Sequence, residues 1–261
     1  MLKLNNIKKF GGNLLKPFCS AFTGKLYTKA AFTLAEVLIT LGIIGVVAAI
    51  TVPSLVSACN KNIVETRLKS IHSTILQAFK MAQAQNGDFS ISNNLYEESD
   101  VNGYSWASSR DAFETYFAPV LNTSTRYERN AFRNVYSASG ITNIPMPFYY
   151  FVMLNNGTVL GFTKNGYDGI RVTVIFNPQK KKLLTGRDVF ELQYMSDEYG
   201  NGYAYNSILK RNYKLSNRQQ YIDACKSNSA HPMYSMTNRE FCAFLIVENG
   251  FKVPKDYPVK L

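Results

Sequence analysis

The chain has 261 residues, of which 46% are hydrophobic and 18% are charged, and its formal net charge is +11. This composition excludes global disorder, and a count of two histidines and four cysteines excludes a histidine-rich metal centre and a disulfide-dense scaffold. Six lysines and no acidic residue lie in residues 1–31. A basic segment directly before an apolar run is more typical of membrane orientation than of nucleic-acid binding, so we expect no nucleic-acid partner.

The first element expected along the chain is a membrane-spanning helix over residues 32–56. This stretch contains 25 residues and one charged side chain, Glu36. About 20 apolar residues span a bilayer, and the apolar core of a secretory signal peptide is shorter than this run. An acidic residue inside such a segment is costly and rare, so Glu36 is a candidate functional residue. Pro53, near the other end, removes a helix hydrogen bond and predicts a bend.

The residues around Glu36 resemble a known processing segment. Ala31-Phe32-Thr33-Leu34-Ala35-Glu36 and the apolar residues that follow, up to Pro53, resemble the N-terminal segment of type IV prepilins and of type II secretion pseudopilins. The resemblance implies that a prepilin peptidase cuts between Ala31 and Phe32 and methylates the new Phe32 amine. Residues 1–31 would then be a basic leader.

The same resemblance implies roles in assembly. Glu36 would pair with the N-terminal amine of a neighbouring subunit, and Pro53 would kink the helix. Opposite charges in an apolar bundle are tolerable when they are paired. The implied partners are the prepilin peptidase, other pilin-like subunits bound through their N-terminal helices, and an inner-membrane assembly platform. The implied fold is α+β and pilin-like: a long N-terminal helix with a membrane-spanning first half, packed on a C-terminal antiparallel β-sheet domain.

Two other interpretations of this region remain open. Glu36 could be an incidental charge at the membrane interface of a generic anchor. Val56-Ser57-Ala58-Cys59 also fits a bacterial lipoprotein cleavage box, and a cut before Cys59 would leave a lipid-anchored domain. The preceding run is far longer than a signal core, which favours the spanning helix.

An amphipathic pattern continues the helix after Val56. Apolar residues recur at spacings of three and four, which is typical of one buried helix face. They are Val64, Leu68, Ile71, Ile75, Phe79 and Ala82. Asn86-Gly87-Asp88 is a stop signal, so one helix is expected over residues 32–86. His72 lies in this helix without a catalytic partner at helical spacing, and we expect it on the helix surface.

Residues 87–261 are expected to form a soluble domain with a sheet of about four antiparallel strands. Phe148–Leu154 and Thr158–Phe162 flank Asn155-Asn156-Gly157 and predict a hairpin. Two further runs, Ile170–Phe176 and Val189–Tyr194, complete the expected sheet, which the helix stripe would cover. A short helix is also expected over Ser109–Phe117.

No metal site is expected. Residues 175–190 resemble a loop of pilin-like proteins that in related major pseudopilins binds calcium. Calcium needs six to eight oxygen ligands, and here Asp188 is the one carboxylate, beside Lys180, Lys181 and Lys182. Asp188 is therefore expected to be a turn residue or an ion-pair partner. Asp197, Glu198 and Asn201 form an acidic group that is expected to be a solvated loop.

Cys225 and Cys242 are expected to form a disulfide. The implied domain faces the periplasm or the cell exterior, where disulfides persist. The alternative is a pair of unpaired buried thiols. His231 lies between the two cysteines, but three ligands make only a weak metal site.

The sequence carries no motif for catalysis, and we expect no enzyme and no cofactor. It contains no nucleophile elbow, zinc-protease, phosphate-loop or dinucleotide motif. The leading hypothesis is a structural pilin-like subunit of a type II secretion or type IV pilus-like filament, first held in the inner membrane with its N-terminus in the cytoplasm. The alternative is an anchored extracytoplasmic binding domain or lipoprotein that enters no filament.

Overall fold

The computed structural model describes residues 33–86, 106–146, 149–165, 169–196, 203–205, 217–227 and 238–261. The chain divides into two compact units, residues 1–49 and 50–261. Within the described residues, the first unit consists of the start of helix α1 (Leu34–Asn86), and the second holds the rest of that helix and all other elements.

Helix α1 contains 53 residues, and its second half is amphipathic in three dimensions as well as in sequence. One stripe of this half is buried against the domain, while most of the remaining positions carry polar side chains. The buried residues are Val64, Leu68, Ile71, Ile75, Ala78, Phe79 and Ala82. The six residues of the predicted stripe are all among them, so the predicted helix face is confirmed.

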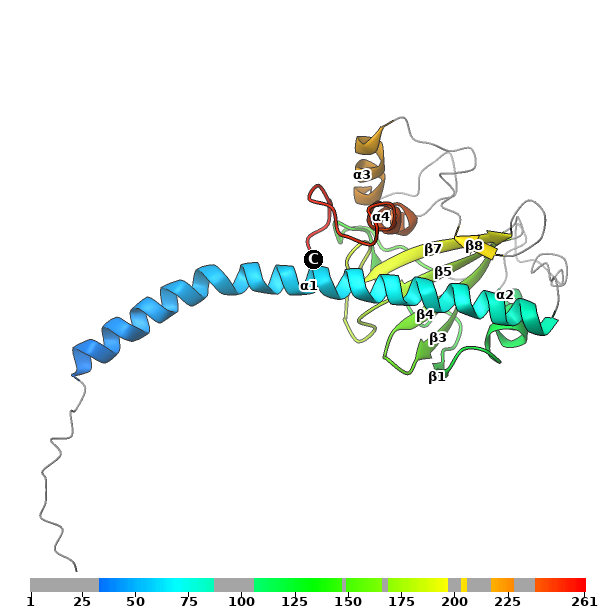
Figure 1. The fold of residues 1–261 in the computed structure, drawn as a ribbon, viewed down its shortest axis with the longest axis horizontal. Helices are drawn as coiled ribbons and strands as arrows, with labels where there is room; N and C mark the ends of the chain where they lie inside the picture. The colour runs from blue at the N-terminus through cyan, green and yellow to red at the C-terminus, as the bar shows by residue number, and fades with distance from the viewer. Residues whose placement is uncertain are drawn as a thin grey trace, which may run out of the picture. The chain divides into compact units, whose positions relative to one another are not determined.

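The domain is built on a six-stranded antiparallel sheet with the order β1-β3-β4-β5-β7-β8. Figure 1 shows α1 crossing this sheet, which gives an α+β arrangement of one long helix on an antiparallel sheet. The strands are β1 (Thr123–Arg126), β3 (Tyr150–Leu154), β4 (Val159–Asn165), β5 (Gly169–Ile175), β7 (Val189–Ser196) and β8 (Tyr203–Tyr205).

The predicted hairpin is present between β3 and β4, where Tyr150 pairs with Phe162. Gly157 occupies the turn with a φ of 78°, a conformation that favours glycine. The four predicted runs correspond to β3, β4, β5 and β7. The sheet has two more strands than expected, the short edge strands β1 and β8. They were missed because three or four residues give too little alternation to identify a strand.

Successive side chains of the central strands point to opposite faces of the sheet. Ile170, Val172 and Val174 of β5 join the main core beneath α1. Arg171 and Thr173 therefore lie on the opposite face, and both are buried. That face is covered in part by a second apolar cluster, which includes Phe132, Phe151 and Ile175.

Smaller elements surround the sheet. The helix predicted over Ser109–Phe117 is a short helix α2 (Trp106–Ala112) that continues as a π-helix η1 (Phe113–Phe117). Strands β2 (Val135–Tyr136) and β6 (Leu183–Leu184) form a small parallel sheet. Periodicity did not predict two helices, α3 (Arg218–Lys226) and α4 (Asn238–Val247). They pack on each other, and α4 also packs on β7 (Figure 1).

Candidate functional site

The start of α1 is an apolar helix whose surface is uncovered. Every residue from Leu34 to Val56 is exposed except the half-buried Ala48. Among the described residues, α1 is the one helix that is long and apolar enough to cross a membrane, and none of its most apolar window is buried. Apolar surface of this extent marks a site that lipid or another protein covers.

Glu36 lies in the first turn of this helix and forms a reciprocal cap with Thr33. The backbone N–H of Thr33 donates to Oε2 of Glu36 at 2.9 Å, and the Thr33 hydroxyl donates to the same oxygen at 2.8 Å. In return, the Glu36 N–H donates to Oγ1 of Thr33 at 3.3 Å. This is a capping box, and the pattern Thr-x-x-Glu is the sequence signal that specifies it.

The cap places an exposed carboxylate beside Thr33, the residue that follows Phe32 in the sequence. Phe32 is joined to Thr33 by one peptide bond, and the Thr33 nitrogen is already 2.9 Å from the carboxylate. Ala31 and Phe32 themselves lie outside the described residues.

Pro53 lies inside α1, and the helix continues through it. Because proline has no N–H, the carbonyl four residues earlier, at Ala49, receives no helix hydrogen bond from this position. The structure thus places the proline where the apolar part of the helix ends and the amphipathic part begins.

The structure joins Cys225 of α3 and Cys242 of α4 in a disulfide, with an S–S length of 2.04 Å. This is the pair for which the sequence predicts a bridge. Both residues are fully buried, and the Cys242 sulfur lies 3.5 Å from the Cys225 carbonyl oxygen. Cys59 is a free cysteine and is exposed on α1.

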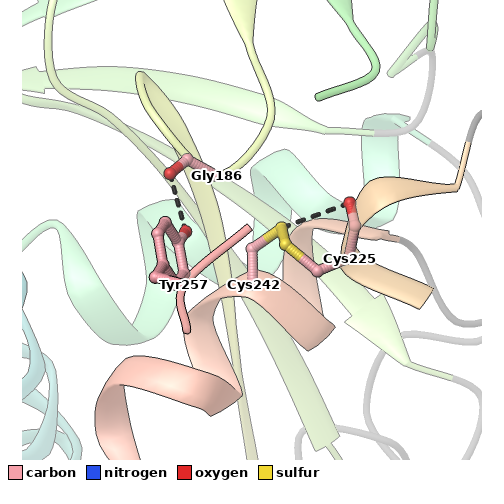
Figure 2. The surroundings of a disulfide bond; sticks show 4 residues. All are labelled: Gly186, Cys225, Cys242 and Tyr257. Atoms are coloured by element: carbon pink, nitrogen blue, oxygen red, sulfur yellow. Dashed lines mark hydrogen bonds between the residues drawn. A yellow bond between two sulfur atoms is a disulfide. The ribbon is translucent and has the colours of Figure 1, made fainter. Parts of the chain in front are cut away.

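The loop before β7 packs against this disulfide (Figure 2). Gly186 has a φ of 76°, and a Cβ atom at this position would lie 2.8 Å from the Cys242 sulfur. The Tyr257 hydroxyl donates to the Gly186 carbonyl at 2.6 Å, and burial raises the pKa of Tyr257. Through these contacts, the disulfide and Tyr257 hold the loop, α3, α4 and the C-terminal segment in contact with one another.

Asp188 is a buried ion-pair partner, which is one of the two roles predicted for it. Its Oδ1 accepts from Nζ of Lys180 at 2.6 Å, and its Oδ2 accepts from the Leu184 N–H and from Arg187. Burial acts to raise the pKa of Asp188, but these donors outweigh burial and lower it. The Asp188 carboxylate therefore stabilises the loop 177–188 through hydrogen bonds to residues of the same loop.

A buried network of charges lies between the sheet and α4. Oε2 of Glu191 accepts from the Tyr149 hydroxyl at 2.8 Å, from Thr173 at 3.1 Å and from Nε of Arg239 at 3.0 Å. The Arg239 and Glu191 side chains are 2% and 0% exposed. Burial opposes ionisation of Glu191, but the charges of Arg239 and Arg171 outweigh it and lower its pKa.

Glu240 also belongs to this network, but its pKa is raised, whereas that of Glu191 is lowered. Its Oε1 lies 3.3 Å from Nε of Arg171. Burial raises the pKa of Glu240 to about 8, Arg171 opposes the rise, and the charge of Glu191 adds to it. Among the residues that the structure describes, no donor forms a hydrogen bond to either oxygen of Glu240 or to Oε1 of Glu191. A proton held by Glu240 reduces the repulsion between these two carboxyl groups.

His72 is more enclosed than the expected surface histidine. Its Nδ1 lies 3.2 Å from the Tyr194 hydroxyl, and its ring stacks on Tyr194 and tilts against Phe251. Burial lowers the pKa of His72. The residue is half-buried in the joint between α1, β7 and the C-terminal segment, which is a packing role.

The other candidate residues lie outside the described part of the chain. These are Asp197, Glu198, Asn201 and His231. Within the described residues, no group of three or more histidine, cysteine, aspartate or glutamate side chains is placed to hold a metal ion.

Comparison with known proteins identifies the family of this chain from a match to its folded domain. A family of unknown function, DUF6613, matches residues 54–261. The match begins directly after Pro53 and so covers the amphipathic part of α1, the sheet and both disulfide-linked helices. No curated protein and no solved structure matches the chain. Because the matched region is well over half of its length, the chain belongs to the DUF6613 family.

Proposed function

We propose that this chain is a pilin-like structural subunit, first anchored in the inner membrane and then assembled through its N-terminal helix into a type II secretion or type IV pilus-like filament. The observation that carries the proposal is the division of α1. Its first part is apolar and uncovered, while its second part buries a stripe on the sheet. A helix of this kind needs a bilayer before assembly and neighbouring helices afterwards.

The Glu36 cap supports a role for this residue in assembly. A carboxylate in an apolar segment is tolerable when a partner satisfies it. In the single chain that partner is Thr33, whose backbone nitrogen lies 2.9 Å from Oε2 of Glu36. Cleavage after Ala31 would create a positively charged amine on Phe32, one residue from Thr33. We expect the carboxylate to exchange its local cap for the amine of a neighbouring subunit, which keeps every charge paired.

The proposal includes processing and topology. A prepilin peptidase removes residues 1–31 on the cytoplasmic side and methylates Phe32. The domain then faces the periplasm, an environment in which the disulfide between Cys225 and Cys242 persists. The filament partners are other pilin-like subunits, delivered by an assembly platform in the inner membrane.

The first test is the mature N-terminus, measured by mass spectrometry of membranes from the native host. N-methyl-phenylalanine at Phe32 is the expected result. An acylated Cys59 would make the chain a lipoprotein, and an intact leader would make it an ordinary anchored domain. Either result would overturn the proposed subunit.

The second test separates processing from assembly. The variant Glu36→Gln should be cleaved normally but should be lost from sheared filaments, since it removes the negative charge and keeps the size of the side chain. Glu248→Gln is the matched control, because Glu248 is exposed in the domain. Normal incorporation of the Glu36 variant would remove the assigned role.

A further inference from the structure

Basic side chains gather around the turns of α1 that directly follow Val56. Three segments contribute: residues 57–67 of α1, the loop 177–188 and residues 252–256. They hold eight basic side chains, which we call the proximal surface, and three acidic ones. The basic residues are Lys61, Arg67, Lys180, Lys181, Lys182, Arg187, Lys252 and Lys255.

Direct contacts place the three segments at the same end of the domain. Nη1 of Arg67 donates to the Phe176 carbonyl at 3.3 Å, and its guanidinium lies 5.9 Å from the centre of the Phe176 ring. Phe176 directly follows β5, so the loop 177–188 begins beside this turn of α1. From the other side, Nζ of Lys252 lies 2.7 Å from Oε2 of Glu65.

The direction of β5 shows which way the loop leaves the sheet. Ile170, near the start of β5, pairs with Tyr194 of β7, whose ring contacts Phe79 of α1. The other end of β5 leads to Phe176, beside Arg67. The strand therefore runs along α1 toward its apolar part, and the loop continues from there.

The acidic residues at this end are already neutralised within the domain. Asp188 is 1% exposed and binds Lys180 and Arg187. Asp256 forms a two-fold ion pair with Arg218. The ion pairs of the described residues leave out Lys181, Lys182 and Lys255, while the charge of Lys61 acts on Glu65. Lys182 lies over the Tyr136 ring at 4.6 Å. The outward charge of the proximal surface is therefore positive.

This surface also holds the whole charge excess of the chain beyond the leader. Residues 32–261 contain 23 basic and 18 acidic side chains. Without the eight basic and three acidic residues of the three segments, fifteen of each remain. The net charge of the three segments, +5, thus equals the net charge of residues 32–261.

The spacing along α1 matches the depth of a lipid headgroup layer. Lys61 follows Val56 by five residues, which is about 8 Å along a helix, and Arg67 is about 17 Å from Val56. A headgroup layer is about 5–8 Å thick on each side of the hydrocarbon core, and screening acts over about 8 Å at physiological salt. Lys61 then lies within the headgroups, and the loop cations lie within reach of their field.

We propose that the proximal surface docks on the anionic headgroups of the phospholipid bilayer that holds the apolar part of α1. This inference rests on the membrane anchor of the proposed function. Charge complementarity selects the occupant, because lysines on a surface continuous with a membrane span attract anionic lipid. Docking holds the domain against the bilayer and fixes its orientation before any assembly step.

The test is lysine footprinting of the full chain in lipid nanodiscs. Discs of phosphatidylcholine are compared with discs that contain about 30% phosphatidylglycerol, and acetylation rates are measured by mass spectrometry. Acetylation of Lys181 and Lys182 should slow roughly threefold or more in the anionic discs and recover at high salt. Lys80 is the internal control, because it is exposed on α1 thirteen residues beyond Arg67 and its rate should not change.

Charge reversal tests the surface independently. In Lys181→Glu, the lipid-dependent protection of Lys182 should fall, whereas Lys80→Glu should leave it unchanged, since both lysines are exposed. Equal acetylation of Lys182 in both lipids would overturn the inference. Protection that depends on the number of chains per disc, and not on lipid charge, would assign the surface to a second copy. A chain that does not insert into either disc would contradict the membrane anchor itself.

Discussion

The carboxylate of Glu65 in α1 accepts the backbone N–H of Val253 at 2.9 Å, although 188 positions separate the two residues. The same carboxylate lies 2.7 Å from Nζ of Lys252. The end of the chain is thereby fixed to the middle of the long helix, in addition to the apolar contacts of Val253, Phe251 and Tyr257 with the main core.

We expect Glu65→Ala to lower the free energy of unfolding by about 1.5–3 kcal/mol, the range for hydrogen bonds to a charged group. Lys252→Ala should cost less than about 1 kcal/mol, because the Lys252 side chain is 70% exposed and solvent screens its charge. Urea unfolding of both variants measures the difference. An equal or larger cost for Lys252→Ala would show that the backbone contact contributes little.

The disulfide between α3 and α4 should be a major part of the stability of this region. Its cysteines are 17 positions apart, and closing a loop of this length contributes about 3 kcal/mol in the chain-entropy model. The double variant Cys225→Ser/Cys242→Ser should lose a stability of this order in urea unfolding under oxidising conditions. Cys59→Ser, at an exposed position, should unfold like the parent chain. A double variant as stable as the parent would contradict this prediction.

Gly186 should tolerate alanine much less well than Gly157 does. Both glycines have a left-handed φ, 76° and 78°, so both substitutions strain the backbone. Only Gly186→Ala also drives a Cβ atom against the Cys242 sulfur, whereas nothing lies within 4 Å of the Cβ position at Gly157. Overpacking costs roughly 1–3 kcal/mol, so Gly186→Ala should be less stable than Gly157→Ala by that amount. Equal unfolding midpoints for the two would show that the disulfide moves aside freely.

The buried carboxyl pair predicts how stability depends on pH. Burial raises the pKa of Glu240 to about 8, and in the unfolded chain it returns to an ordinary value near 4.5. Between these two values the folded protein holds a proton that the unfolded chain releases. The contribution of Glu240 to the free energy of unfolding therefore falls as the pH rises through this window.

Glu240→Gln imitates the protonated side chain and should flatten this decline. The variant should match the parent near pH 5 and exceed it in stability above pH 8. Urea unfolding at several pH values measures this, with the exposed Glu248→Gln as the control. Glu191→Gln should instead destabilise the protein by about 3–5 kcal/mol near neutral pH, because Arg239 would be left buried without its partner. If the free energy of unfolding of Glu240→Gln depended on pH as strongly as that of the parent, a group other than Glu240 would hold the proton.

Local patterns in the sequence predict the elements that depend on near neighbours. The stripe from Val64 to Ala82 follows from helical periodicity, and the β3–β4 hairpin follows from two strand-like runs around Asn156-Gly157. The cap between Thr33 and Glu36 also has a local signal, the pattern Thr-x-x-Glu. Each of these signals lies within a few residues of the feature it specifies.

The charge network could not be predicted in this way, because its members come from distant segments. The alternation in β5 places Arg171 on the face opposite Val172, and such a position is usually exposed to solvent. Here α4 brings Arg239 and Glu240 from about 70 residues away to cover that face. Periodicity within β5 carries no information about a helix that packs on it from so far along the chain.

The disulfide has a consequence for limited proteolysis. Cys225 and Cys242 bracket the chain between α3 and α4, so a single cut in that interval severs the backbone but leaves both products covalently joined. A nicked sample would migrate as one band on a gel without reductant and as two bands after reduction. The upstream product would keep the sheet, and the downstream product would keep α4 with the segment that binds Glu65.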